Sequence, residues 1–141
     1  MSRVDFYVLS ASGEAARQQF ACRLAEKAYK LKNRVHIHVD GADAANRIDD
    51  LLWTFRDGSF VPHELLGGPI KPSSPVTIGS HELPDFDCDL LINLGESIPE
   101  RANAFPRVAE VVTSDDDCRS RSRQRFVDYR DQGHTLDTHK L

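Results

Sequence analysis

Arginine and aromatic side chains are concentrated near the end of the chain. Residues 119–130 contain five arginines and two aromatic residues, although the whole protein is acidic. In a helix, at ~100° per residue, four of these side chains fall within an arc of roughly 60°. They are Arg119, Arg123, Phe126 and Arg130.

Guanidinium groups bind carboxylates through paired hydrogen bonds and stack on aromatic rings. This face is suited to a short acidic peptide that ends in an aromatic residue. The alternative is an amphipathic helix whose charged face contacts only solvent.

A second candidate site follows the end of a predicted helix. Trp53 lies where other residues already supply the apolar stripe of that helix, and Phe60, Val61 and Pro62 lie in the loop beyond it. Large apolar side chains in a loop need to be buried by something. Either they fold back onto the domain or they form a patch that binds a partner.

Patterns that would support catalysis or cofactor binding are incomplete. The turn at residues 10–13 has one glycine, whereas a phosphate-binding loop needs several. His36, His38 and Asp40 resemble the start of a metal-dependent hydrolase site, but no further ligand cluster supports it. We interpret the two histidines as polar residues on the less buried face of an edge strand, and Cys22 as a buried small residue. The sequence predicts no catalytic residues, no metal and no cofactor.

The composition is that of a soluble globular protein. The 141 residues are enough for one domain (1–141), with 40% hydrophobic and 28% charged residues. A net charge of −4 argues against general nucleic-acid binding. No apolar run approaches the ~20 residues of a membrane span, and we expect no signal peptide. Three cysteines without a CxxC motif indicate reduced thiols in a cytoplasmic protein.

Strand-like runs alternate with helix-like periods along the chain. The predicted strands are residues 4–9, 35–39, 76–78, 90–94 and 108–112; the predicted helices are 12–33, 42–55, 99–105 and 114–132. Ser114 is the expected N-cap of the last helix and Gly133 its C-cap. A long irregular stretch, 56–75, separates the second helix from the third strand. The alternation predicts a three-layer α/β fold with a mainly parallel sheet and helices on both faces, Rossmann-like but without a nucleotide site.

Two blocks of sequence, taken together, resemble the chi subunit family of bacterial DNA polymerase III holoenzyme. One is Ser-Phe-Val-Pro-His at 59–63 after Leu52-Trp53, and the other is Arg-Phe-Val-Asp-Tyr-Arg at 125–130 followed by Gly133. The likeness runs nearly the full length of the chain. It implies an accessory subunit of the clamp-loader assembly in DNA replication, without catalysis of its own. The implied partners are the psi subunit and the acidic C-terminal tail of single-stranded DNA-binding protein, which ends in Pro-Phe.

The resemblance also implies which residues bind each partner. The tail site would consist of Arg119, Arg123, Phe126, Val127 and Arg130. The psi site would consist of Trp53, Phe60, Val61, Pro62 and His63. Arg123 would pair with the terminal carboxylate, Arg119 with upstream aspartates, and Phe126 would wall the pocket for the terminal ring.

Two positions of the tail site depart from the family pattern. Val127 stands where that pattern has a lysine, and Phe126 replaces a tyrosine. Arg121 and Arg125 are candidates to replace the lost charge, although their helical angles place them off the main face. The rival function is direct single-stranded DNA binding through the arginine and aromatic residues of this helix. The acidic global charge weighs against it.

Overall fold

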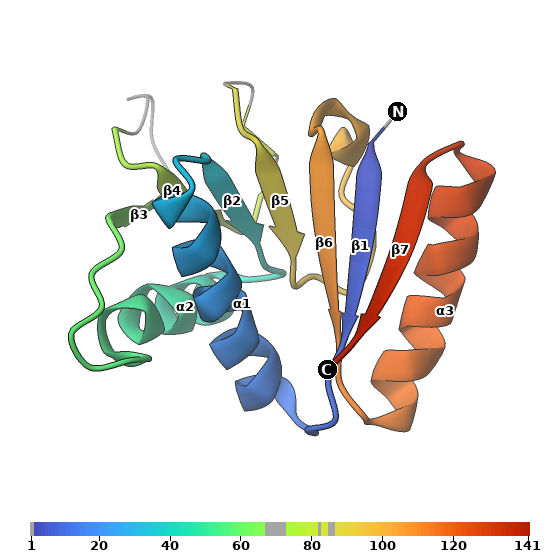
Figure 1. Ribbon diagram of the computed structural model, residues 1–141, viewed down its shortest axis with the longest axis horizontal. Helices are drawn as coiled ribbons and strands as arrows, with labels where there is room; N and C mark the ends of the chain where they lie inside the picture. Colours follow the sequence, from blue (N-terminus) through green and yellow to red (C-terminus); the bar gives the residue numbers. More distant parts are fainter. Residues whose placement is uncertain (1, 67–72, 82, 85–86) are drawn as a thin grey trace.

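The computed structural model describes residues 2–66, 73–81, 83–84 and 87–141. Its strands are β1 (Arg3–Val8), β2 (Val35–His38), β3 (His63–Leu65), β4 (Val76–Gly79), β5 (Leu90–Asn93), β6 (Arg107–Val112) and β7 (Thr135–Lys140). Its helices are α1 (Glu14–Lys30), α2 (Ala42–Thr54) and α3 (Asp116–Asp131), with a 3-10 turn η1 (Ala102–Ala104). The strands form one sheet in the order β3-β4-β2-β5-β6-β1-β7, and every neighbouring pair is parallel (Figure 1).

The sheet is covered on both faces, as predicted. One core joins α1 and α2 to the face of the sheet that carries Ile37, Ile78 and Ile92. A second core joins α3 to the opposite face, through Phe6 and Tyr129. The continuous apolar run of β5 predicted a central strand, and all four of its residues are buried between β2 and β6. The predicted three-layer α/β architecture is therefore confirmed.

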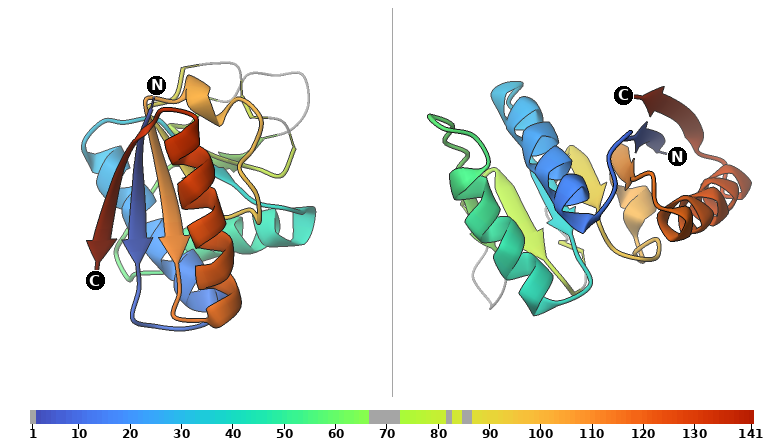
Figure 2. Two further views of the ribbon diagram at one scale, coloured as in Figure 1. Left: turned by 90° about the vertical axis from the view of Figure 1, so that its right-hand side faces the viewer. Right: turned by 90° about the horizontal axis from the view of Figure 1, so that it is seen from below.

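Capping residues and charged side chains mark both ends of the last helix, α3. Asp115, rather than the predicted Ser114, is the N-cap of α3, and two further aspartates in the first turn complement the positive end of the helix dipole. Gln132, rather than the predicted Gly133, is the C-cap. Gly133 follows it with φ +87°, a conformation that favours glycine, and the chain then turns into β7. Figure 2 shows α3 running beside β6, β1 and β7 in the opposite direction to the strands.

Two strands lie where the sequence predicted none. β3 falls inside the predicted irregular stretch 56–75, of which residues 67–72 lie outside the described part of the chain. β7 is mostly polar and lies at the edge of the sheet, and its burial does not alternate along the strand. Its pairing partner is β1, the first strand of the chain. Pairing over such a sequence separation leaves little local pattern to recognise.

The prediction that His36 and His38 lie on the less buried face of an edge strand is wrong. β2 is an interior strand between β4 and β5, and His36 is completely buried with Nδ1 2.8 Å from Thr77 Oγ1. Burial, and to a smaller extent the neighbouring His38, lower the pKa of His36 to about 3, so it is neutral. Within the described ranges no three His, Cys, Asp or Glu side chains come together as metal ligands.

Burial of Cys22 is confirmed, and it raises the pKa of this thiol to about 12. No helix in the part of the chain that the structure describes is both long and apolar enough to cross a membrane.

Candidate peptide-binding site

A buried carboxylate on β6 fixes α3 against the sheet. Glu110 is fully buried and accepts hydrogen bonds from Arg125 Nε (2.9 Å), Tyr129 Oη (2.8 Å) and Asn93 Nδ2 (2.8 Å). Burial raises the pKa of Glu110, while the Arg125 charge and the three hydrogen bonds oppose that shift. Arg125 also donates to the Glu96 carbonyl at 2.9 Å. Two residues of the C-terminal sequence block therefore position α3, and the adjoining rim of the helix remains available to a ligand.

A pocket of about 570 Å³ lies between α3 and the adjoining strands. From the helix it is lined by Arg119, Ser122, Arg123, Phe126 and Val127. Four of the five residues predicted for the tail site thus line one cavity. The fifth, Arg130, does not line it, and its guanidinium group lies 3.5 Å from the Asp131 carboxylate.

The floor of this pocket is apolar and partly aromatic. Phe6, Val8 and Val112 line it from the sheet. The Phe6 and Phe126 rings have centroids 5.4 Å apart and are tilted by 53°. Phe126 is half-buried, so part of its ring is accessible from the pocket. A third aromatic ring would find tilted or edge-to-face partners here, the geometry that aromatic side chains prefer.

The rim of the pocket is positively charged. Arg119, Arg123 and Lys140 line it, and all three side chains are exposed. No aspartate or glutamate is among the described residues that line it. None of the three cations forms an ion pair within 4.0 Å with any residue in the described ranges. The cavity therefore combines an apolar floor with unneutralised positive charge.

The other arginines of α3 do not contribute to this rim. Arg121 lines a separate pocket on the far side of the helix, together with acidic Glu96, Asp128 and Asp131. The Arg125 guanidinium group is occupied by Glu110. Neither side chain is placed to replace the charge that Val127 lacks.

The second candidate surface consists of an exposed aromatic pair, Trp53 and Phe60, which we call the aromatic patch. Their side chains are 57% and 62% exposed, and their ring centroids lie 5.8 Å apart. The other three residues predicted for this surface are less exposed than this pair. Val61 belongs to the core, Pro62 is half-buried, and the His63 ring is buried with Nε2 3.1 Å from the Asp49 carbonyl. The His63 ring also packs 4.7 Å from Trp53, so it supports the patch from below.

Sequence reasoning missed one residue that holds the aromatic patch in place. Glu26 of α1 is buried and accepts hydrogen bonds from Arg56 and from the Ser59 hydroxyl, both in the loop that leads to Phe60. The hydrogen bond from Ser59 lowers the pKa of Glu26 in spite of burial, and the Arg56 contacts add to this effect. The only sequence signal was an acidic residue on the side of α1 that also carries Cys22, which is expected to be buried.

Comparison with known proteins identifies the relatives of this chain. The family model described as "DNA polymerase III chi subunit, HolC" matches residues 1–137. A DNA polymerase III subunit chi from Pseudomonas aeruginosa is 40% identical over 141 residues, covering 100% of this chain and 98% of the relative. The subunits of the same name from Escherichia coli and Haemophilus influenzae are 32% and 31% identical over 143 and 140 residues. They cover 98% and 97% of this chain, and 97% and 96% of their own length.

Proposed function

This chain belongs to the DNA polymerase III chi subunit family, and on that premise we propose that it is a non-catalytic adaptor with two binding surfaces. As a chi subunit it is an accessory part of the replicative polymerase. The proposed partner of the pocket beside α3 is the acidic C-terminal tail of single-stranded DNA-binding protein. The proposed partner of the aromatic patch is the psi subunit of the clamp loader.

The observation that carries the tail assignment is the charge pattern of the pocket. Three cations that form no ion pair within the described ranges surround an apolar floor, and no carboxylate is among the described residues that line the pocket. A peptide that ends in an aromatic residue and carries acidic side chains matches both properties. In this proposal the terminal ring packs against Phe6 and Phe126, the terminal carboxylate binds Arg123, and Arg119 binds an upstream aspartate.

Direct binding of single-stranded DNA is the rival function for the same cations. Single-strand binding proteins track the phosphate backbone with a long positive groove and stack successive bases on aromatic side chains. This protein offers one short basic rim in an acidic molecule, and Phe126 is only partly accessible. The dependence of affinity on salt separates the two functions, because many phosphate contacts give a steep slope and a few ion pairs a shallow one.

The test is fluorescence anisotropy of a labelled peptide that matches the C-terminus of the host's single-stranded DNA-binding protein. We expect micromolar binding that is lost when the terminal phenylalanine is removed. Arg123→Ala should cost about 1.5–3 kcal/mol of binding free energy, the usual range for a charge-assisted hydrogen bond. Arg121→Ala is the matched control, since it removes an arginine from the far side of the same helix. An Arg123→Ala variant that binds like the wild type would refute this site assignment.

The aromatic patch supports the psi assignment. Exposed tryptophan and phenylalanine at the centre of an interface are the residue types that contribute most to binding energy. The hydrogen bonds from Arg56 and Ser59 to Glu26 order the loop that carries Phe60. A patch ordered in advance loses less conformational entropy when a partner binds.

A further inference from the structure

We propose that Lys140 of β7 determines the specificity of the peptide pocket, where it binds, together with Arg119, the acidic residues that precede the terminal aromatic residue. This inference rests on the proposed function of the pocket. The edge strand β7 was not predicted from the sequence, and Lys140 was not among the predicted site residues.

The register of the sheet places Lys140 in the pocket. β7 pairs with β1 in parallel, so that Lys140 lies opposite Val8 and Thr138 lies opposite Phe6. Val8 in turn lies opposite Val112 on β6. Residues in one row of a parallel sheet point to the same face, and this face is the one that α3 covers. All of these residues line the same cavity.

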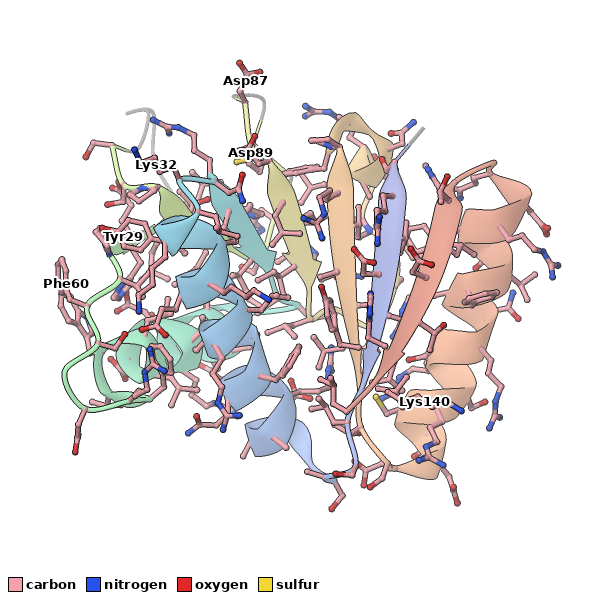
Figure 3. The ribbon with its side chains drawn as sticks, in the orientation of Figure 1. Tyr29, Lys32, Phe60, Asp87, Asp89 and Lys140 are labelled. Atoms are coloured by element: carbon pink, nitrogen blue, oxygen red, sulfur yellow. The ribbon has the colours of Figure 1, made fainter. Side chains whose placement is uncertain are left out.

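Lys140 and Arg119 lie at the same end of the pocket. Arg119 belongs to the first turn of α3, which follows the carboxyl end of β6 directly. Lys140 is the last residue of β7, which runs parallel to β6 and β1. It therefore lies at the same end of the strands, their carboxyl ends. Figure 3 shows Lys140 at that end of β7, beside the start of α3.

The aromatic residues lie at the other end. Phe126 follows Arg119 by two helical turns, a rise of about 10 Å. Phe6 lies two residues before Val8 on β1, so it is displaced toward the same end as Phe126 and packs on its ring. Arg123 lies between the two ends. Along its length the pocket thus presents Arg119 and Lys140 at one end, Arg123 in the middle, and the Phe6 and Phe126 rings at the other end.

This order fits a single direction of the bound peptide. With its terminal ring packed against Phe6 and Phe126 and its terminal carboxylate at Arg123, the preceding residues extend toward Arg119 and Lys140. Two cations from different elements can then contact acidic side chains from both sides. Arg119 alone would reach them only from the helix.

The test compares two peptides of equal length that end in the same phenylalanine. One carries aspartates at the upstream positions, and the other carries asparagines there. Lys140→Ala should weaken binding of the aspartate peptide about two- to fivefold, as expected for an exposed ion pair. It should leave the affinity for the asparagine peptide unchanged, and Lys140→Arg should restore binding of the aspartate peptide.

Lys32→Ala is the matched control, because it also removes one exposed lysine charge but lies at the far end of the sheet (Figure 3). If Lys140→Ala binds both peptides as the wild type does, the role of Lys140 is refuted while the proposed function stands. Equal weakening for both peptides would also refute it, since Lys140 would then not recognise the upstream acids. If the wild type binds neither peptide, the proposed function itself fails.

Discussion

Asp5 is a buried carboxylate that joins three neighbouring strands. It lies on β1, and its side chain is only 2% exposed. Its carboxylate contacts His139 Nε2 of β7 at 2.9 Å and Arg107 Nη2 of β6 at 3.3 Å. Arg3 lies at 3.3 Å on the same strand and also pairs with Asp137 of β7. Asp5 therefore helps to hold the edge strand that carries Lys140.

We expect the stability contributed by Asp5 to depend on pH. Burial acts to raise the pKa of Asp5, but hydrogen bonds from His139 and Arg107 and the Arg3 charge outweigh it, so the pKa lies below the ordinary value of 3.8. A lowered pKa in the folded state means that the charged form stabilises the fold. Its contribution is complete above pH 3.8 and is lost as the pH falls through the lower pKa of the folded state.

Asp5→Asn should therefore lower the free energy of unfolding by about 1–2 kcal/mol at neutral pH. The difference from the wild type should shrink as the pH falls below the ordinary aspartate pKa. Urea unfolding of both proteins over this range measures it. A difference that stays constant or grows toward acid pH would contradict the charged role of Asp5.

At the scale of elements, α3 has two faces with different tasks. One face holds the helix on the sheet through Arg125 and Tyr129, which converge on Glu110. The adjoining rim presents Arg119 and Arg123 to the pocket. Residues that are close in sequence are thus divided between folding and binding by their angle around the helix.

Arg125→Ala should destabilise the protein by about 3–5 kcal/mol, because it leaves the Glu110 carboxylate buried without its cation. Arg121→Ala, which removes an exposed arginine four residues earlier, should change stability by less than about 0.5 kcal/mol. Thermal or urea unfolding of the two variants measures this difference. Equal stability of the two arginine variants would show that the buried network does not hold α3.

At the scale of the whole molecule, the two proposed surfaces lie on opposite sides. Figure 3 shows Phe60 beyond α2 at one side of the sheet and Lys140 at the other. The sheet order places β3 and β7 at its two edges, with five strands between them. A ligand at one surface leaves the other accessible, so an adaptor of this shape would hold two partners at once.

We therefore expect the two surfaces to act independently. Phe60→Ala should weaken binding of the psi subunit by about 2 kcal/mol or more, as for a central aromatic residue of an interface. It should leave the affinity for the tail peptide unchanged. Leu31→Ala is the matched control, because it truncates another exposed apolar side chain outside both surfaces. Titration of each variant with psi and with the peptide measures both effects. Loss of both partners in a folded Phe60→Ala protein would contradict the two-surface arrangement.

Local patterns in the sequence determined most of the elements. Apolar runs and helical periods predicted five of the strands, three helices and the parallel α/β architecture, because burial on one face imposes a short repeat on the residue types. The same helical repeat brought Arg119, Arg123 and Phe126 to one side of α3, and the structure places all three in one cavity. These features depend on neighbours within a few residues of each other.

Only the tertiary structure decided which side chains meet across the chain. Glu110 selects Arg125 for the interior, whereas periodicity alone places both Arg121 and Arg125 off the main face and does not distinguish them. The sheet order makes β2 an interior strand and buries His36. The polar segment 135–140 becomes strand β7 because it pairs with β1, and this pairing brings Lys140 to the pocket. Such contacts join residues far apart in the chain, and their free energy depends on burial and charge that exist only once the sheet has formed.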